Sequence, residues 1–274
     1  MGSLTNYGEN AVANHICRNS AYTPAATVYL VLCTADPNEA ATGAACNETA
    51  NANGYARTAI TFGAAATRRV TQNADVSFPV ATGNYASPIS HWALADSGTY
   101  GAGNILAYGA FATPRTVLNG NTPVVRTAAQ EVYVEITAST GLSNYAANAM
   151  LDRMFRNQAF TIAANYAALA TAALTDSTTT PTEVSGGSYA RVQVNPNGGG
   201  SPAWSTVSGG SFSNNADVNF PTPTASWGTM TSLFFADASS GGNVLWYDNA
   251  VTDQAIGIGD TVYIPSGSAS FTQS

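Results

Sequence analysis

Lysine is absent from this chain, and all nine of its basic residues are arginine. A lysine Schiff base, a phosphate-loop lysine and a lysine general base are therefore excluded. Charged residues make up only 9% of the chain, and the net charge is -7. Binding to nucleic acid requires a cationic face, whereas the longest run of basic residues here is the pair Arg68 and Arg69. We therefore expect no nucleic-acid partner.

Long apolar runs and metal-ligand patterns are also missing. No apolar stretch reaches the roughly 18 residues that a membrane-spanning helix needs, so we expect no membrane partner. The only histidines are His15 and His91, and no Cys-x-x-Cys, His-x-x-x-His or EF-hand pattern occurs. Without a Gly-x-Ser-x-Gly elbow, His91 is interpreted as a half-exposed strand residue. We expect no metal, no cofactor and no catalytic residue, and hence no enzyme.

Cysteine is scarce, with three residues in the whole chain. Cys17 lies where a second copy of the same segment, described below, has Phe155, which favours a buried apolar position. Cys33 and Cys46 bracket a polar loop and have no counterparts in that second copy. A disulfide between them would stabilise the fold by roughly 3 kcal/mol. Two reduced thiols are the alternative, and the sequence leaves both open.

What the chain does contain is a duplication. Residues 142–157 repeat residues 4–19 at a constant offset of 138 residues, with Leu, Asn, Tyr, Asn, Ala, Arg and Asn in the same places. An internal repeat of this kind indicates tandem copies of one domain. We predict two domains of about 135 residues, each long enough to bury its own core. Copy 1 spans residues 1–139 and copy 2 spans residues 140–274.

Each copy is predicted to begin with a helix, over residues 6–18 in copy 1 and 144–156 in copy 2. Thr5 or Asn6 is the predicted N-cap of the first helix and Ser143 that of the second. Both segments end in Arg-Asn, which suits a helix C-terminus. The second helix has an apolar stripe that should pack on a sheet or a neighbour, made of Tyr145, Met150, Leu151, Met154 and Phe155.

Short strand-like segments separated by turn residues follow each helix. Residues 27–33 are β-branched and aromatic, whereas their counterpart near 166–174 is Ala-rich and is assigned as a strand only because the duplication places it there. About six to eight short antiparallel strands per copy, with turns about every 10 residues, are typical of a β-sandwich or small barrel. The predicted fold is mainly β, with two tandem antiparallel β-sandwich domains, jelly-roll-like, each opened by one N-terminal α-helix.

Several residues recur in both copies, and we expect them to serve the fold that the copies share. These repeated structural residues are Tyr7 and Tyr145, Arg18 and Arg156, Arg57 and Arg191, Asp75 and Asp217, and Phe78 and Phe220. For Arg57 and Arg191 two roles stay open, a buried ion pair within each copy or a contact to a neighbouring subunit. His15 has Arg153 as its counterpart, which indicates a solvated or interfacial position.

Recurring carboxylates raise the possibility of paired catalytic acids, as in a glycosidase. The pairs are Asp36 with Asp176, Asp75 with Asp217, and Asp96 with Asp237. Each lies at a strand end beside Ala, Ser, Asn or Thr, where Asp usually binds a main-chain N–H group in a turn. We therefore interpret these residues as structural rather than catalytic.

Copy 2 contains three of the four tryptophans, Trp204, Trp227 and Trp246. If exposed, they could form a platform for carbohydrate, although core packing is the commoner fate of a strand tryptophan. A carbohydrate-binding or carbohydrate-active module is therefore kept as a hypothesis from another functional class.

The repeated segments together resemble a group of known proteins. The segments are Tyr-Ala-Arg at 55–57 and 189–191, Asn-Ala-Asp-Val-x-Phe-Pro at 73–79 and 215–221, Gly-Asn-Val-Leu at 242–245 and Gly-Asp-Thr-Val at 259–262. The chain resembles small tailed-bacteriophage virion proteins of the tail-fibre or minor structural type. The resemblance covers nearly all of copy 2 and most of copy 1, which departs from it by its cysteine-bracketed loop and by Asn-Thr-Pro at 121–123. It implies a virion structural protein.

The position on the virion is a separate question. No heptads, collagen-like triplets or long β-repeat that would elongate a fibre are visible. We therefore favour a head decoration or cement protein that binds and stabilises the capsid exterior, with a tail or tail-fibre-associated protein contacting the host as the alternative. Expected partners are other virion proteins, either the major capsid protein or tail proteins, and further copies of the chain in a homo-oligomer. The protein would assemble in the host cytoplasm and be exposed on the particle exterior.

Overall fold

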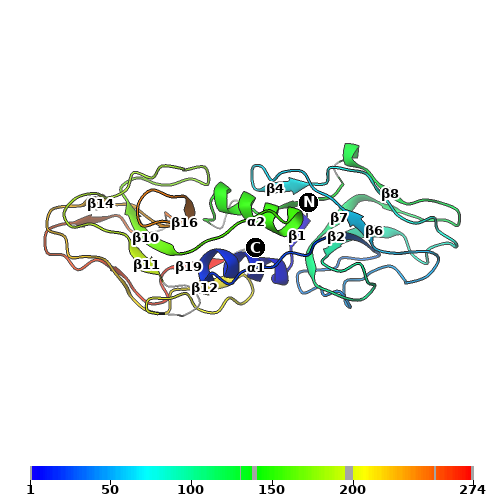
Figure 1. Ribbon diagram of the computed structural model, residues 1–274, viewed down its shortest axis with the longest axis horizontal. Coiled ribbons are helices and arrows are strands. Elements are labelled where there is room, and N and C mark those ends of the chain that lie inside the picture. Colours follow the sequence, from blue (N-terminus) through cyan, green and yellow to red (C-terminus); the bar gives the residue numbers. More distant parts are fainter. Residues whose placement is uncertain (1, 130, 138–140, 195–199, 250, 273–274) are drawn as a thin grey trace.

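A computed structural model describes residues 2–129, 131–137, 141–194, 200–249 and 251–272. The two copies lie end to end along the longest axis of the molecule, with copy 1 at the right and copy 2 at the left of Figure 1. The two long helices lie at the middle, where the copies meet. The predicted boundary between residues 139 and 140 lies outside the described residues.

Both predicted helices are confirmed with the predicted bounds. Helix α1 spans Asn6–Arg18 and helix α2 spans Asn144–Arg156. The N-caps are Thr5 and Ser143, and the C-caps are Asn19 and Asn157. Each N-cap hydroxyl accepts a hydrogen bond from a main-chain N–H of the first turn, and each Asn ends its helix in the left-handed conformation. Neither described helix has the length and apolarity that a bilayer crossing requires.

Copy 1 contains a five-stranded antiparallel sheet in the order β1-β7-β6-β2-β3. Its strands are β1 (Gly2–Leu4), β7 (Ile105–Arg115), β6 (Ile89–Ala95), β2 (Val28–Cys33) and β3 (Thr58–Ile60). β1 precedes α1 and has only three residues, too few to show an alternating pattern in the sequence. Its pairing with β7 is what makes it a strand.

Copy 2 repeats this sheet in the order β11-β10-β15-β16. The strands are β11 (Val192–Val194), β10 (Asn165–Ala170), β15 (Ser232–Ala236) and β16 (Val244–Asp248). Leu142 bridges to Trp246, where copy 1 pairs β1 with β7. The Ala-rich β10 is a strand because it has a paired neighbour on both sides, and this tertiary context overrides its helical propensity.

Short antiparallel ladders complete each sandwich. Copy 1 pairs β4 (Arg69–Thr71) with β9 (Tyr133–Glu135) and β5 (Val76–Ser77) with β8 (Val124–Val125), and has a 3-10 turn, η1 (Thr127–Ala129). Copy 2 pairs β12 (Ser211–Ser213) with β19 (Ser270–Thr272), β13 (Val218–Asn219) with β18 (Tyr263–Ile264), and β14 (Gly228–Met230) with β17 (Gln254–Ile256). The fold is mainly β, with two tandem β-sandwich domains, as predicted.

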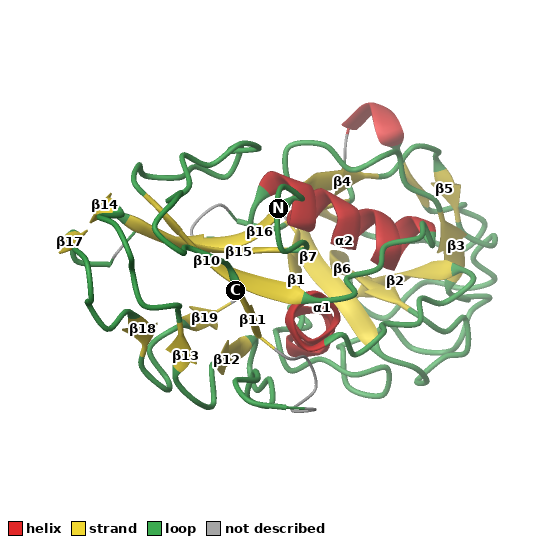
Figure 2. Ribbon diagram, turned by 60° about the vertical axis from the view of Figure 1, so that its left-hand side comes forward, coloured by secondary structure: helices red, strands yellow, loops and turns green. Residues whose placement is uncertain are grey.

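The main hydrophobic core is shared by the two copies. One connected cluster of buried side chains runs from Leu30 in copy 1 through Ile16 and Leu151 on the helices to Trp246 in copy 2. Each copy is long enough to bury a core of its own, but both helices lie between the two sets of strands (Figure 2) and contribute side chains to one connected cluster. The two copies are therefore packed as one body.

Candidate functional site

The first candidate site is the contact between the copies, which α1 and α2 build. Helix α1 packs on β7 of its own copy and on β12 of copy 2, and α2 packs on β16 of its own copy and on β4 of copy 1. β4 and β12 are equivalent strands in the duplication. Each helix thus contacts its own sheet and the same strand of the other copy. This reciprocal arrangement is the pattern of an isologous dimer interface, here within one chain.

Polar contacts at the helices repeat the same reciprocity. His15 Nε2 hydrogen-bonds the carbonyl oxygen of Phe160 at 2.9 Å, and Arg153 Nη2 donates to the carbonyl oxygen of Tyr22 at 3.1 Å. Positions 153 and 160 are the counterparts of positions 15 and 22. The sequence leaves open a solvated or an interfacial position for His15, and in the structure His15 lies at the interface between the copies.

A second reciprocal pair involves the same asparagine of each helix. Asn10 Oδ1 accepts a hydrogen bond from Gly210 N at 2.9 Å, and Asn148 Oδ1 accepts one from Arg68 N at 2.8 Å. Asn10 and Asn148 are equivalent, and so are the turns that contain Arg68 and Gly210. These bonds, with those of His15 and Arg153, relate the copies by a pseudo-two-fold axis.

Arg68 departs from this symmetry through its side chain. Nε donates to the carbonyl oxygen of Ile136 at 2.8 Å, Nη2 to that of Thr137 at 2.5 Å, and Nη1 to that of Leu142. Nη1 also lies 3.7 Å from a carboxylate oxygen of Asp176 in copy 2. One buried guanidinium therefore contacts the chain on both sides of the link between the copies.

Burial sets the protonation of two side chains on α1. His15 Nδ1 accepts a hydrogen bond from Tyr22 N at 3.1 Å, so the proton resides on Nε2, which donates to Phe160, and the ring is neutral. Burial lowers the pKa of His15. Burial, and secondarily the charge of Glu39, raises the pKa of Glu9 to about 7.

Apolar contacts across the interface differ between the two sides. The rings of Phe62 and Phe155 lie 5.3 Å apart on one side. On the other side the equivalent positions hold Trp204 and Cys17, both buried. The buried position predicted for Cys17 is confirmed. A pair of equal rings on one side is thus replaced by one large and one small side chain on the other.

The recurring arginines form ion pairs within their own copies. Arg57 Nη2 lies 2.7 Å from Glu48 Oε2, and the Tyr55 hydroxyl donates to the same carboxylate at 2.9 Å. This hydroxyl accepts a bond from Leu32 N at 3.2 Å, which fixes the cluster to β2. The sequence leaves open an ion pair within the copy or a contact to a neighbouring subunit for Arg57, and in the structure Arg57 forms the ion pair within its copy.

Copy 2 repeats this Glu-Tyr-Arg cluster. Arg191 Nη2 lies 2.7 Å from Glu183 Oε2, and Tyr189 donates to Glu183 at 2.9 Å and accepts from Leu169 N at 2.9 Å. Neither glutamate is among the residues predicted from the sequence. A signal was present, since each precedes the repeated tyrosine, by 7 residues in copy 1 and by 6 in copy 2.

The repeated aspartates hold turns, as the sequence indicates. Asp75 Oδ1 accepts bonds from the main-chain N–H and the hydroxyl of Thr127 at 2.8 and 2.9 Å, and these bonds hold the pKa of Asp75 below its usual value. Asp217 Oδ1 accepts a bond from Ser266 N at 2.8 Å. The neighbouring Phe78 and Phe220 are buried in the core.

The repeated residues of the helices divide into two kinds. Arg18 donates to Asn14 at 3.0 Å, and Arg156 pairs with Asp152 at 2.9 Å, so both hold the last turn of their helix. Tyr7 and Tyr145 are 39% and 42% exposed. Tyr145 is thus the most exposed member of the predicted stripe, and its ring packs edge-on against Phe160 at 6.0 Å. The other four members of the stripe are buried.

The other aspartates and His91 have structural partners. Asp96 and Asp237 each accept a bond from the main-chain N–H of an asparagine in a hairpin turn, at 2.7 Å in both copies. Asp36 accepts one from Asn38 N at 3.0 Å, and Asp176 accepts one from the Tyr247 hydroxyl at 2.5 Å. His91 is half-buried in its strand and contacts Ser90 Oγ. Within the described ranges, no three metal-ligating side chains gather.

Cys33 and Cys46 are buried together in a small apolar cluster as free thiols. The disulfide alternative is thus not the state found in the structure. The core packing expected of the copy 2 tryptophans is confirmed, because Trp204, Trp227 and Trp246 are all buried and so form no exposed platform for carbohydrate. Trp204 packs edge-on against three phenylalanine rings of copy 2, which form an aromatic core.

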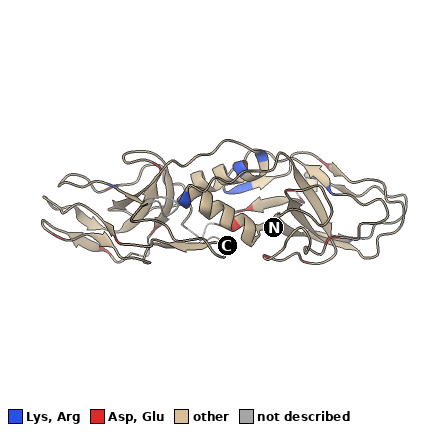
Figure 3. Cartoon of the chain, turned by 60° about the horizontal axis from the view of Figure 1, so that its bottom comes forward, with Lys and Arg blue, Asp and Glu red and all other residues tan. Residues whose placement is uncertain are grey.

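Arginines gather at the middle of the molecule, around the two helices and β4 (Figure 3). Those on or next to these elements are Arg18, Arg68, Arg69, Arg153 and Arg156. With Arg57 and Arg191 in the two Glu-Tyr-Arg clusters, only Arg115 and Arg126 remain, and both belong to copy 1. Copy 2 has only Arg191 outside the helix α2, and this residue is paired with Glu183.

A comparison with curated proteins found no match. A comparison with protein families found one family twice in the chain, over residues 3–134 and over residues 141–272, and its description is podophage GP4 fiber I protein gp80. The two matched segments coincide with the two copies and together take up nearly the whole chain. The protein thus belongs to the podophage GP4 fiber I protein gp80 family, and it is a bacteriophage virion structural protein.

Proposed function

We propose that this chain is a structural module of a podophage tail fibre. The observation that carries the proposal is the match of a phage fibre family to both copies. This match favours the tail-fibre alternative over the head decoration or cement protein that the sequence alone favours. We propose a mechanical role for the chain. The titratable side chains described above fit such a role, because they stabilise turns, form ion pairs or contact the interface between the copies.

The geometry suits a rigid, elongated building block. The sequence has no heptads or triplets to elongate a fibre, but two sandwiches joined end to end give an elongated unit without them (Figure 1). The shared core and the Arg68 contacts hold the copies in one orientation. A module of this kind transmits force between its two ends without a flexible hinge between the copies.

The proposed partners are other virion proteins of the tail, with the host surface as a further contact. Assembly in the host cytoplasm, exposure on the particle exterior and a homo-oligomeric state are parts of the same proposal. The interface between the copies buries part of the middle of the molecule, and we place such contacts at the two ends far from the helices.

Electron microscopy of phage particles labelled with a gold-coupled antibody against the chain tests this proposal. We expect label on the tail at few positions per particle. Particles that lack the protein should adsorb poorly to the host yet keep the heat and osmotic resistance of the head. Label over the whole head, together with heads that burst at lower temperature when the protein is missing, would instead support a decoration protein.

A further inference from the structure

Each copy has an open groove at the end of the molecule that lies away from the helices. The groove of copy 1 lies between β7 and β8 and has a volume of about 250 Å³. The groove of copy 2 has about 240 Å³ and is lined by β18, the counterpart of β8. Leu32 and Leu169, which occupy equivalent positions in β2 and β10, line the two grooves. The pseudo-two-fold arrangement therefore places one groove at each end of the molecule.

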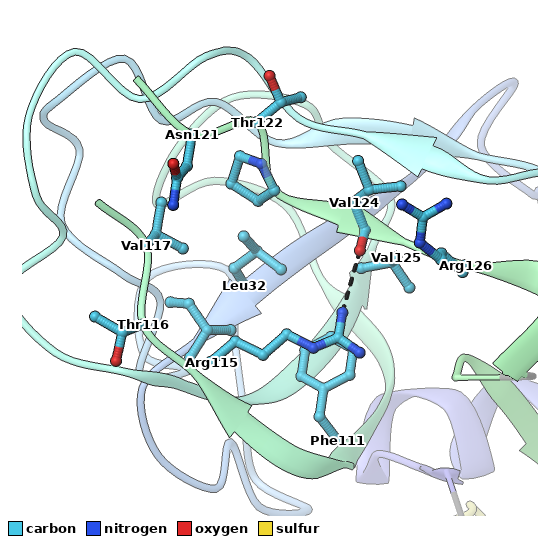
Figure 4. Close-up of a pocket in the computed structure, with 12 residues that line it drawn as sticks. Leu32, Phe111, Arg115, Thr116, Val117, Asn121, Thr122, Val124, Val125 and Arg126 are labelled. Atoms are coloured by element: carbon cyan, nitrogen blue, oxygen red, sulfur yellow. Dashed lines mark hydrogen bonds between the residues drawn. The ribbon is translucent and has the colours of Figure 1, made fainter. Parts of the chain in front are cut away.

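The groove of copy 1 combines an apolar floor with a cationic rim. Leu32, Phe111 and Val125 line it, the side chain of Arg115 crosses it with its guanidinium over the Phe111 ring, and Arg126 lies at its edge (Figure 4). Arg115 Nη1 donates to the carbonyl oxygen of Val124 at 3.1 Å, which holds the guanidinium between β7 and β8. The side chains of Arg115 and Arg126 are 46% and 64% exposed.

The acidic neighbours of these arginines leave room for another carboxylate. Arg115 pairs with Glu131, and Arg126 Nη1 lies 3.6 Å from Asp75. In the second pair both side chains are exposed, Arg126 by 64% and Asp75 by 44%, so that pair is weak because water competes for both charges. A carboxylate brought to the rim by a docked partner would therefore interact chiefly with Arg126 and also with the exposed part of Arg115.

The end of copy 2 presents an exposed aliphatic side chain beside a carboxylate. Ile258 is 73% exposed, the largest exposure of any large apolar side chain among the described residues. It lies in a turn that two hydrogen bonds fix, from Gly257 N to Asp260 Oδ2 at 2.7 Å and from Gly259 N to the carbonyl oxygen of Pro223 at 2.9 Å. Asp260 is exposed beside it. The turn is a preformed projection with an apolar tip.

Charge makes the two ends complementary to each other rather than to themselves. Copy 1 has six arginines and eight acidic residues, and copy 2 has three arginines and eight acidic residues, so their net charges are -2 and -5. The three arginines of copy 2 lie on α2 or in the ion pair with Glu183. Two copy 2 ends would therefore bring only carboxylates together, whereas a copy 1 end supplies Arg115 and Arg126.

We propose that the molecule associates end to end, with the 257–260 turn of one chain docked in the copy 1 groove of a second chain. Ile258 covers the apolar floor, and Asp260 faces the guanidinium groups of Arg115 and Arg126. The groove has room for this side chain, because a smaller cavity of roughly 150 Å³ already accepts benzene. The contact joins different surfaces of the two chains, so it continues into a linear filament or closes into a ring. This self-association does not depend on the place of the protein in the virion.

Sedimentation velocity of the intact chain over a concentration series tests the docking. We expect the weight-average mass to rise at least twofold above that of the monomer as concentration increases, and to fall back at high salt, because screening weakens the contact between carboxylate and guanidinium. The variants Ile258→Asp and Arg126→Glu should each stay monomeric over the same range. The variant Tyr7→Ser, which changes an exposed aromatic residue on α1 at the middle of the molecule, should associate like the wild type.

Mixing the two monomeric variants tests whether the turn of one chain docks in the groove of another. The Ile258→Asp chain keeps an intact groove and the Arg126→Glu chain keeps an intact turn, so an equimolar mixture should form dimers and stop there. Circular dichroism and the thermal midpoint of each variant establish that it is folded. A wild type that stays monomeric up to its solubility limit overturns the proposal. A wild type that associates while the mixture of variants stays monomeric overturns the pairing of turn and groove.

Discussion

The same turn is built in two ways in the two copies. Copy 2 has Gly209 and Gly210 with φ angles of 54 and 68°, whereas copy 1 has Thr67 and Arg68 with φ angles of 50 and 66°. Glycine adopts this left-handed conformation freely, and other residues lose roughly 1–2 kcal/mol each. Copy 1 therefore retains local backbone strain that copy 2 avoids.

The contacts of Arg68 explain why the strain persists. A glycine at this position could not reach the carbonyl oxygens of Ile136 and Leu142 or the carboxylate of Asp176. The chain crosses from copy 1 to copy 2 only once, so the link lies on one side of the pseudo-two-fold axis, and Arg68 contacts the residues that flank it there. The two turns indicate that both copies keep one backbone, and that the side chains differ where the covalent link breaks the symmetry.

The largest expected effect comes from breaking the core that the copies share. Leu151 is fully buried on α2, and the variant Leu151→Asp would place an unpaired charge there. We expect a loss of more than about 4 kcal/mol in the free energy of unfolding, with both copies unfolding together. Thermal unfolding followed by circular dichroism measures it. Tyr145→Ser on the same helix is the control and should change the midpoint little, and a Leu151→Asp chain with wild-type stability would contradict the shared core.

The Glu-Tyr-Arg clusters allow a direct comparison of the two copies, because the same ion pair is less exposed to solvent in copy 1 than in copy 2. The side chains of Arg57 and Glu48 are 0% and 5% exposed, and those of Arg191 and Glu183 are 4% and 24% exposed. Removing one partner of a buried pair costs roughly 3–5 kcal/mol, and less where water reaches the remaining charge. We expect Arg57→Met to destabilise the protein more than Arg191→Met in urea unfolding. The double variant Arg57→Met with Glu48→Gln should recover part of the loss, and an equal or reversed order of the single variants would contradict this ranking.

Two side chains of α1 should give stability an opposing dependence on pH. Burial lowers the pKa of His15 from 6.5, so below this pH the unfolded chain binds a proton that the folded chain does not, and stability falls with decreasing pH. The pKa of Glu9 is raised from 4.5 to about 7, so the folded chain keeps a proton that the unfolded chain releases, and stability falls as pH rises through this window. His15→Gln should remove the first dependence and Glu9→Gln the second.

Urea unfolding of the wild type and both variants between pH 4.5 and pH 8 measures these dependences. A His15→Gln chain that loses as much stability on acidification as the wild type would show that His15 is not the titrating group.

The smallest expected effect concerns the strained turn. Thr67→Gly should stabilise the protein by about 0.5 kcal/mol, because relief of the left-handed strain slightly exceeds the entropy that glycine adds to the unfolded chain. Arg68→Gly should destabilise it, since the contacts to the link are lost. Gly209→Ala in copy 2 is the matched test and should cost roughly 1 kcal/mol. Equal effects of Thr67→Gly and Arg68→Gly would show that the Arg68 side chain contributes nothing.

The sequence predicts the helices and most strands because their signals are local. Ser143 and Asn157 bracket α2 through capping preferences that act within one turn, and the duplication carries the strand assignment to the Ala-rich β10. The shared core is not predictable in this way. Whether α1 faces its own sheet alone or also β12 of the other copy depends on packing between segments some 200 residues apart, such as Asn10 and Gly210.

The candidate site was predictable only in part, for the same reason. The repeated Arg57 and Asp75 are visible as repeats, but the partner of Arg57 is visible only once the loop from 34 to 53 has folded back to bring Glu48 to it. The interfacial position of His15 follows from its partner Phe160, which is distant in the sequence. Alanine and threonine in the loops give no periodicity that would indicate the two grooves.

Differential scanning calorimetry of the intact chain, at low concentration and high salt to suppress self-association, tests the shared core most directly. One body with one core should unfold in a single transition, with a calorimetric enthalpy equal to the van't Hoff enthalpy. Two separate transitions, each with about half of the total enthalpy, would show that the copies fold as independent domains and would contradict a core common to both.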